Sequence, residues 1–350
     1  MSVKTKLSLQ EQLCIFTNNM IRIITLLILL ITVGAGIVQA EQIIHPTVIP
    51  KSKEEFSLEE IGERTTIAIP ALKIENISNS WGPVLSDTTT IVTQVLVSEP
   101  SLSLVSLAVS CSVYLNGIKM TEGLGEDLTI ERVAEGSLVR FNNKINNNSE
   151  NIAKWWASHI KNGERTKAII KGKLIINLGG VDLAYPFSWK NEFQTDMLGD
   201  INTTDVSNFS FGLYTLQIQS LDSEWGKITT KETQIKYTIK IYNSSKIPGA
   251  PIINRIEYDF LLNGIKMAEG GTGLPLVIWP GKTESVVFTI KMDSRKLKAW
   301  WISHIKSHER TSYQFQYYLL VKFLGTTLAR WPKEVEGGFE TDFLALKSSQ

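Results

Sequence analysis

The stretch Leu115–Met120, which reads LNGIKM, decides how this chain is organised, because it returns at Leu262–Met267. Each copy is followed by a box of the form Trp-Trp-x-Ser-His-Ile-Lys, then by Glu-Arg-Thr, and finally by Phe-x-Thr-Asp. The motifs recur at separations of 147, 145 and 146 residues (positions 115 to 262, 155 to 300, and 193 to 339). So constant a spacing over so long a segment indicates two copies of one folded domain. We predict a first copy at residues 62–200 and a second at 201–350.

The composition is that of an ordinary globular protein. Of 350 residues, 43% are hydrophobic and 20% are charged, and the formal net charge is +1. This balance gives no argument for nucleic acid or for a strongly acidic partner. The chain contains no phosphate loop, dinucleotide fingerprint or Gly-x-Ser-x-Gly elbow. The motifs therefore indicate no catalytic residue, cofactor or metal.

Residues 21–38 are almost wholly apolar and predict a membrane-spanning helix, since about 17 to 20 such residues cross a bilayer. Lys4, Lys6 and Arg22 lie at or before the start of this run. The positive-inside rule then places residues 1–20 in the cytoplasm as a leader.

The segment 21–40 is therefore expected to be a membrane anchor that leaves everything after Glu41 outside the cytoplasm. The alternative is a signal peptide that starts at Met20, is cleaved after Ala40 and yields a secreted protein. Residues 41–61 are rich in proline and charge and read as a solvated linker. Five Asn-x-Ser/Thr sequons would then lie outside, at Asn76, Asn147, Asn202, Asn208 and Asn243. The two cysteines, Cys14 and Cys111, fall on opposite sides of the apolar run, so the exported part can form no internal disulfide and Cys111 is expected in the core.

Each copy is predicted to be mainly β. Stretches rich in β-branched residues predict strands in the first copy at 65–77, 88–97, 104–115, 136–145, 166–178 and 181–193. Asn116-Gly117 and Asn263-Gly264 are dipeptides typical of type I′ hairpin turns, and the glycines at 270–273 read as a hairpin loop. Regularly spaced antiparallel strands with such turns predict a β-sandwich.

The exception to the β pattern is one short helix in each copy, at 150–161 and 295–306. Ile152, Trp156 and Ile160 follow an i, i+4, i+8 spacing that puts them on one helix face. Leu297, Trp301 and Ile305 repeat that face in the second copy. Ser149 and Ser294 stand just before the two segments and are predicted to cap them.

The helix box is the main candidate for function. Its members are Trp155, Trp156, His159, Glu164, Trp300, Trp301, His304 and Glu309. Trp156 and Trp301 lie on the apolar stripe and are expected in the core. Each histidine reads first as a buried side chain with a hydrogen-bonded partner, and alternatively as a metal ligand or general base. A metal site needs three or four ligands, and each copy repeats only one His and one Glu, so the structural interpretation is favoured.

These residues resemble the late-embryogenesis-abundant type-two family, also called the water-stress and hypersensitive-response (WHy) domain, in the tandem form found in archaeal members. Trp81-Gly82 and Trp225-Gly226 match the opening of the family pattern, and the two Asn-Gly pairs match its end. The likeness covers about residues 65–346. The chain departs from the pattern at the Asn-Pro turn, where it has Ser98-Glu99-Pro100 and Asn243-Ser244-Ser245.

The resemblance implies two tandem antiparallel sandwiches of fibronectin-like or immunoglobulin-like shape, each with one helix, and no catalytic residues. It further implies a role in stress or desiccation tolerance. Two alternatives stay open. The chain could be a surface adhesion or binding module for a glycan, an envelope polymer or a protein, or it could be a hydrolase that uses the repeated His and Glu.

Overall fold

The computed structural model describes residues 42–44, 47–49, 72–98, 106–148, 150–178, 181–202, 207–323 and 326–344. The expected leader, membrane segment and most of the linker lie outside these residues. Within the described part of the chain, no helix is long and apolar enough to cross a bilayer. The described residues are mainly β-strands paired antiparallel, with few helices.

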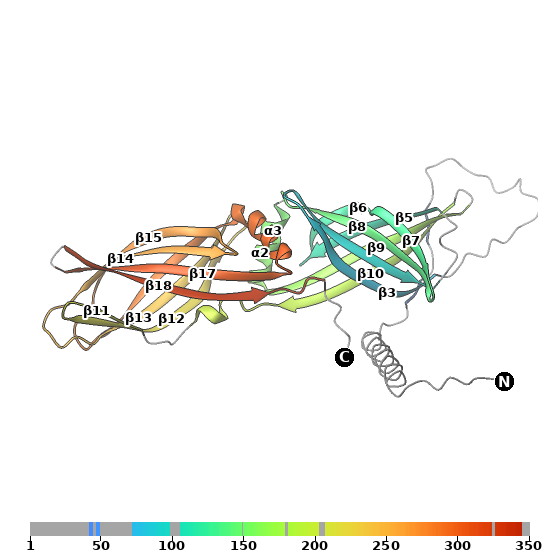
Figure 1. The fold of residues 1–350 in the computed structure, drawn as a ribbon. Coiled ribbons are helices and arrows are strands. Elements are labelled where there is room, and N and C mark those ends of the chain that lie inside the picture. Colours follow the sequence, from blue (N-terminus) through green and yellow to red (C-terminus); the bar gives the residue numbers. More distant parts are fainter. Residues whose placement is uncertain are drawn as a thin grey trace, which may run out of the picture. The chain divides into compact units, whose positions relative to one another are not determined.

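The first copy, together with two short strands from the expected linker 41–61, forms two five-stranded sheets (Figure 1). One has the order β1-β3-β4-β8-β7, with strands Gln42–Ile44, Leu72–Val84, Thr88–Val97, Gly136–Asn146 and Glu126–Val133. The other has the order β2-β10-β9-β5-β6, with strands Thr47–Ile49, Val181–Gln194, Arg165–Leu178, Ser106–Leu115 and Ile118–Leu124. Strand β3 covers the described part of the predicted strand 65–77, from Leu72, and continues to Val84, so it includes the Trp81-Gly82 pair.

The second copy holds two four-stranded sheets. One has the order β11-β12-β13-β16, with strands Ser207–Phe211, Tyr214–Ile228, Glu232–Asn243 and Thr283–Asp293. The other has the order β15-β14-β17-β18, with strands Ile265–Val277, Ile252–Leu262, Arg310–Phe323 and Thr326–Glu340. Alternating burial along β13 and β16 shows that one face of each strand turns inward, as period-two patterning requires.

Aromatic contacts join the two sheets within each copy. In the first copy, the rings of Phe141 on β8 and Phe187 on β10 lie 6.1 Å apart. In the second, Tyr237 on β13 stacks on Phe315 of β17 at 4.5 Å. Cys111 on β5 is buried in the first of these cores, as expected for a small apolar side chain.

The two helices are α2, Asn151–Lys161, and α3, Leu297–Lys306, and they confirm the predicted segments to within two residues. The predicted cap at Ser294 is wrong. A 3₁₀ turn, Ser294–Lys296, precedes α3, and Asp293 caps that turn by accepting from the Arg295 backbone N–H. The predicted cap at Ser149 lies outside the described residues.

Local backbone geometry confirms the hairpin turns and corrects the glycine cluster. Asn116 and Asn263 have φ of 50° and 48°, and the glycines after them are also positive, as type I′ turns require. Gly270 and Gly271 belong to strand β15, not to a loop. A Cβ at Gly270 would meet the Tyr258 hydroxyl at 2.9 Å, so the missing side chain makes room for a cross-strand neighbour.

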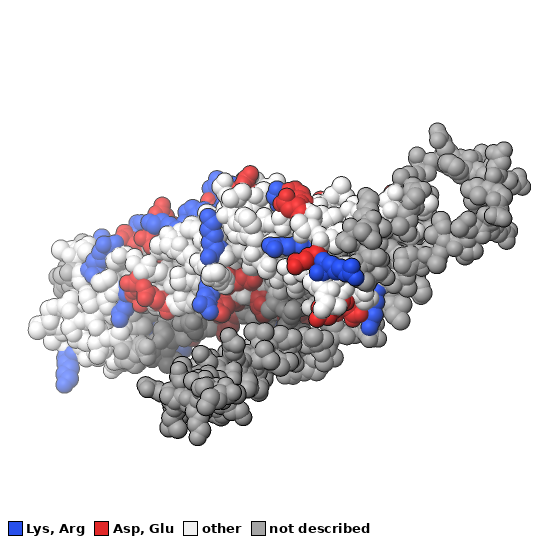
Figure 2. Space-filling view, turned by 45° about the vertical axis from the view of Figure 1, so that its right-hand side comes forward, with Lys and Arg blue, Asp and Glu red and all other residues white. Residues whose placement is uncertain are grey.

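Residues 43–345 form one compact unit that contains both copies. Their buried apolar side chains make one connected cluster. The core therefore continues from one copy into the other through α2 and α3, which contact each other. On the surface shown in Figure 2, basic and acidic side chains are interspersed, in keeping with the net charge near zero.

Candidate functional site

The helix boxes lie where the two copies meet, and each sends a tryptophan into the other copy. Trp156 on α2 donates from Nε1 to Oγ1 of Thr233 on β13, at 3.1 Å. Trp301 on α3 donates from Nε1 to Oγ1 of Thr89 on β4, at 3.2 Å. Both threonines are buried. The relation is reciprocal, as in the interface of a two-fold symmetric dimer.

Trp156 fills the end of the second copy. The side chains around it come mainly from that copy: Trp225, Ile235, Phe260, Leu262, Met292, Tyr313 and Phe339. Met197 and Leu198, which follow the Phe-x-Thr-Asp motif of the first copy, insert beside it. The space left among these residues is about 10 Å³, room for one water molecule at most.

Trp301 fills the end of the first copy in the same way. Its neighbours there are Trp81, Ile91, Val113, Leu115, Ile145, Ala168, Ile170 and Trp189. Phe343 and Leu344, which follow the second Phe-x-Thr-Asp motif, insert beside it and leave about 10 Å³. Trp156 and Trp301 are thus core residues, as predicted, but each belongs to the core of the opposite copy.

Trp155 and Trp300 occupy the centre between the copies. Their rings stack with an interplanar angle of 8° and a centroid separation of 6.2 Å. Each indole N–H remains within its own copy: Trp155 donates to Thr166 Oγ1 at 2.9 Å, and Trp300 to Thr311 Oγ1 at 3.0 Å. Both rings are fully buried, so these two positions are core as well.

His159 is buried and hydrogen-bonded through both ring nitrogens. Nδ1 lies 2.8 Å from Thr166 Oγ1, and Nε2 lies 2.9 Å from Thr195 Oγ1. Thr195 Oγ1 in turn donates to Oε2 of Glu164 at 2.9 Å. His304 repeats the arrangement with Thr311 and Thr341, each at 2.7 Å, and Thr341 donates to Glu309 at 2.9 Å.

The donor pattern determines the tautomer when the carboxylate is ionised. The indole N–H of Trp155 can only donate, so Thr166 Oγ1 accepts a hydrogen bond from it. The Thr166 hydroxyl then donates a hydrogen bond to His159 Nδ1. Nε2 of His159 then carries the ring hydrogen and donates to Thr195 Oγ1. The Thr195 hydroxyl in turn donates a hydrogen bond to Glu164. Every polar atom in this row has a partner while the ring is neutral. In agreement, burial lowers the pKa of His159 to about 4 and that of His304 to about 3.

The two glutamates tie the network to the other copy. Glu164 accepts at Oε2 from the Met197 backbone N–H at 2.7 Å and at Oε1 from Nε1 of Trp225, on β12 of the second copy, at 2.8 Å. Glu309 accepts from the Phe343 backbone N–H at 2.7 Å and from Nε1 of Trp81, on β3 of the first copy, at 2.6 Å. Burial raises the pKa of Glu309 above its usual value.

Glu164 and neighbouring Arg165 do not form an ion pair, although opposite charges stand side by side in the sequence. Both glutamates sit in the left-handed region, with φ of 59° at Glu164 and 62° at Glu309, which turns the carboxylate inward. Arg165 points outward, where its Nε donates to Gln194 at 3.1 Å. Arg310 pairs instead with exposed Glu340.

Sequence reasoning omitted four threonines from the site: Thr166, Thr195, Thr311 and Thr341. All four stand inside the repeated Glu-Arg-Thr and Phe-x-Thr-Asp motifs. The repeat itself therefore contained the signal, but a threonine in a β-rich segment reads as a strand former unless its partner is known.

Neither histidine faces an opening. An open groove of about 830 Å³ lies beside the first turns of α2 and α3, lined among others by Glu150, Lys231, Lys291 and Lys298, and neither histidine lines it. Among the described residues, no group of three or more His, Cys, Asp or Glu side chains is placed to hold a metal. The sequons at Asn147 and Asn243 are buried, and their side-chain amides donate to Leu85 and Ile278 carbonyls.

Comparison with known proteins gives one family match. Residues 222–333 match the profile of the family described as late embryogenesis abundant protein. No curated protein matches the chain.

Several solved structures are similar to parts of the chain. A protein from Archaeoglobus fulgidus is 23% identical over 36% of this chain and 99% of its own, with a TM-score of 0.34. An Arabidopsis thaliana protein is 10% identical over 40% of this chain and 84% of its own, with a TM-score of 0.29. A structure titled putative beta-galactosidase, from Bacteroides fragilis, is 11% identical over 84% of this chain and 41% of its own, with a TM-score of 0.22. At scores of this size, these likenesses carry no argument about fold or function.

Proposed function

We propose that this chain is a non-enzymatic protein with two domains of the late-embryogenesis-abundant type-two kind, which protects other macromolecules under water stress. The family match within the second copy supports this assignment. The first copy repeats the motifs of the second, which extends the assignment to both. We infer that each copy is a sandwich of two sheets with one helix, supported by the ring contacts between Phe141 and Phe187 and between Tyr237 and Phe315.

The observation that carries the non-enzymatic assignment is the closed network around each histidine. A general base needs a proton of the substrate within about 3.2 Å, directly or through one water. His159 and His304 are 1% and 0% exposed, and both ring nitrogens of each are already bonded to threonine hydroxyls. Their lowered pKa values also keep the rings neutral at physiological pH. The network holds the copies together and leaves no nitrogen for a substrate.

The protective role is tested by drying a sensitive enzyme with the full chain. We expect recovered activity to rise with the amount of chain, above the level given by an equal mass of serum albumin. The variant with Trp156→Ala and Trp301→Ala is the matched control, because it keeps the composition and loses the packing. Recovery no better than with albumin would contradict the protective role. Equal recovery with the control variant would show that the fold is not needed.

The hydrolase alternative has its own test. The change of His159 and His304 together to Ala should leave any hydrolytic turnover of the preparation on generic ester and glycoside substrates unaltered. A turnover that is present in the parent and lost in this variant would reinstate the alternative.

We propose further that residues 21–40 hold the chain in a membrane with both copies outside the cytoplasm, or that cleavage after Ala40 releases them. The apolar run and the basic residues before it support this. Protease added to intact cells should digest both copies. Protection that is lost only on lysis would refute export, and N-terminal sequencing of the mature chain distinguishes the anchor from the cleaved form.

A further inference from the structure

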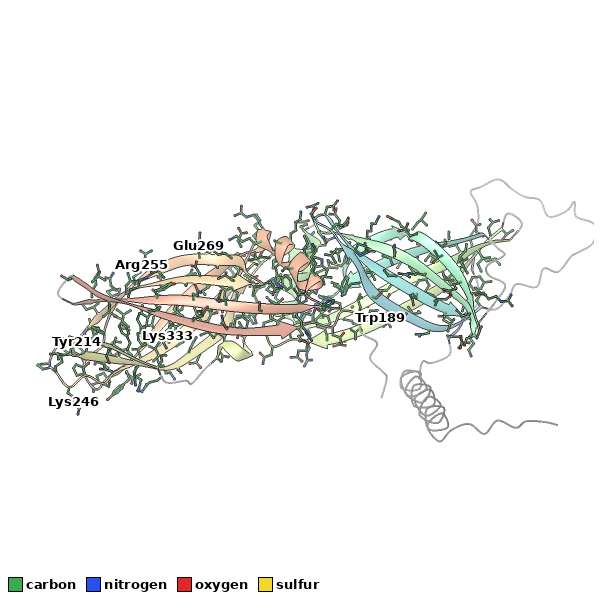
Figure 3. The ribbon with its side chains drawn as sticks, viewed as in Figure 1. Trp189, Tyr214, Lys246, Arg255, Glu269 and Lys333 are labelled. Atoms are coloured by element: carbon green, nitrogen blue, oxygen red, sulfur yellow. The ribbon has the colours of Figure 1, made fainter. Side chains whose placement is uncertain are left out.

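Three described connections lie at the end of the second copy that is opposite α3. Strands β11, β13, β15 and β17 end there, and β12, β14, β16 and β18 begin there, because β16 runs towards α3, β17 runs away from it, and neighbouring strands of each sheet are antiparallel. The connections are the turn 212–213, the loop 244–251 and the loop 278–282, which we call the tip loops. Tyr214 and Lys246 lie together at this end in Figure 3.

The tip loops expose large apolar side chains. Leu213 is 76% exposed and Trp279 is 60% exposed. Val277, at the end of β15, is also exposed. Apolar side chains this large and this open at one end of a domain are a feature of surfaces that meet another apolar phase.

Buried Asn243 holds the loop that carries Trp279. Its backbone N–H donates to the Lys282 carbonyl at 3.0 Å, its carbonyl accepts from Gly281 at 2.8 Å, and its Nδ2 donates to the Ile278 carbonyl at 2.7 Å. Within the loop, the Lys282 N–H closes a turn on the Trp279 carbonyl at 3.0 Å. The exposed indole is therefore presented on a fixed backbone, so binding through it would cost little ordering entropy.

Asn243 also links the other two tip loops to each other. Oδ1 of Asn243 accepts from the Ser245 backbone N–H at 3.0 Å, and Ser245 Oγ accepts from the Thr215 N–H at 2.8 Å. Thr215 lies two residues after Leu213. Asn243 and Ser245 are thus occupied in holding the loops, and the exposed side chains of the tip loops include apolar Leu213 and Trp279 and basic Lys246 and Lys282.

The tip loops carry no acidic residue. The described residues 207–217, 241–254, 276–283, 320–323 and 326–330 contain no Asp or Glu, and the nearest acidic residue in the sequence is exposed Glu284, opposite Ile241 on β13. The tip loops themselves carry Lys246 and Lys282, and both are exposed. An anionic partner is complementary to such a surface.

The first copy lacks this surface at the equivalent turn. With the Trp-Trp boxes aligned, Trp279 and Pro280 correspond to Ala134 and Glu135. Ala134 and Glu135 are exposed in a short turn between β7 and β8. The turn at Ala134 and Glu135 is therefore an internal control for the tip loops. It stands at the aligned position of the first copy, lacks the tryptophan and carries an acidic residue.

We propose that the tip loops of the second copy bind an anionic lipid bilayer, with Leu213 and Trp279 entering its interface and Lys246 and Lys282 facing the headgroups. Tryptophan concentrates at the membrane–water interface because its ring is apolar and its N–H polar. Lysines near the surface are attracted by anionic lipids. A sugar-binding surface would instead need free polar groups beside the Trp279 ring. The side chains of Asn243 and Ser245 are already hydrogen-bonded to the backbone of the loops.

The experiment uses the full chain with a reporter at the tip, so that any binding by residues 21–38 does not obscure the result. Cys14→Ser removes one thiol, and buried Cys111, whose pKa burial raises to about 12, stays unmodified. Ser244→Cys, on an exposed position of the tip, takes an environment-sensitive fluorophore. Ala134→Cys takes the same label at the equivalent turn of the first copy.

Vesicles with one third phosphatidylglycerol should shift the label at position 244 to the blue, and spin-labelled lipid should quench it. The label at 134 should not respond, and neither label should respond to phosphatidylcholine alone. Lys246→Gln with Lys282→Gln should weaken the binding about 30-fold, since each lysine near an anionic surface contributes about fivefold. Leu213→Ser with Trp279→Ala should abolish the shift, whereas Leu124→Ser, which changes a leucine exposed in the first copy, should leave it intact.

Several results would overturn the proposal: no shift at 244, an equal shift at 134, or an equal shift with neutral vesicles. A shift caused by a soluble acidic polysaccharide in the absence of vesicles would assign the tip to another class of partner and also overturn it. The drying assay involves no lipid, so the failure of one proposal leaves the other standing.

Discussion

Nε1 of Trp156, on the helix of the first copy, donates to Oγ1 of Thr233, on a central strand of the second copy, at 3.1 Å. Trp301 and Thr89 make the same contact in the opposite direction. Each copy therefore supplies the side chain that closes the end of the other. Stability, cooperativity and pH response of the two copies should consequently be shared.

Trp156→Ala should destabilise the second copy as well as the first. Truncation of a buried tryptophan costs about 3–5 kcal/mol of unfolding free energy, a large part of the 5–15 kcal/mol typical of a domain. Amide exchange should accelerate on β13 and β17 of the second copy, although the mutation lies in the first. Trp279→Ala is the control, since that ring is exposed and its loss should leave the denaturation midpoint unchanged. Loss of protection confined to the first copy would contradict the exchange of tryptophans.

Cleavage between the copies should not separate them. A protease site placed within residues 203–206 of the full chain would cut the connection and leave the interface untouched. The two fragments should elute together in size-exclusion chromatography after cutting. The same cut in the variant with Trp156→Ala and Trp301→Ala should release them. Fragments of the parent that separate and remain folded would show instead that each copy folds alone.

Glu164→Gln should destabilise the protein by about 1–3 kcal/mol, the cost of leaving a buried polar group without its partner. The amide offers one acceptor oxygen, so its NH₂ must face either the Trp225 indole N–H or the pair of donors from Thr195 and Met197. Chemical denaturation measures the change. Glu192→Gln, on an exposed position of β10, is the matched control and should be neutral. Equal midpoints for the two variants would rule out a structural role for the network.

Stability should fall as pH drops below about 6.5. The pKa of His159 is lowered from 6.5 to about 4 and that of His304 to about 3, so the unfolded chain binds protons that the folded chain excludes. The stabilising contribution of each neutral ring is complete above pH 6.5 and is lost as pH falls through the folded-state pKa. The contributions amount to on the order of 3 kcal/mol for His159 and 5 kcal/mol for His304, at about 1.36 kcal/mol per pKa unit.

Glu309 should oppose this trend. Its raised pKa means that the folded state holds a proton more readily than the unfolded one, so its unfavourable contribution at neutral pH is relieved as the carboxyl protonates. Denaturation midpoints measured from pH 7 to pH 4 should therefore fall in the parent and fall less in the variant with His159→Gln and His304→Gln. A parent whose midpoint is flat over this range would show that the rings are not held neutral.

Much of the local structure could be predicted from sequence. The repeat spacing predicted two copies, the β-branched runs predicted a mainly β protein, and the i, i+4, i+8 pattern placed both helices. Positive φ at the Asn-Gly turns and burial of Trp156 and Trp301 also followed from residue type and spacing. These features depend on interactions between residues close in the chain, or on the simple separation of apolar from polar faces.

The partners of those faces were decided only by the tertiary structure. Periodicity tells which side of a helix is apolar, but not which sheet covers it. Because both copies carry the same motifs, a contact of Trp156 with its own copy and one with the other copy have the same sequence signature. Glu164 shows the same limit: its neighbour Arg165 was the obvious partner, yet a positive φ turns the carboxylate inward to Trp225, 61 residues away. A buried carboxylate loses its water and must accept hydrogen bonds from fixed donors instead. For Glu164 these donors come from both copies, so only the assembled pair brings them together.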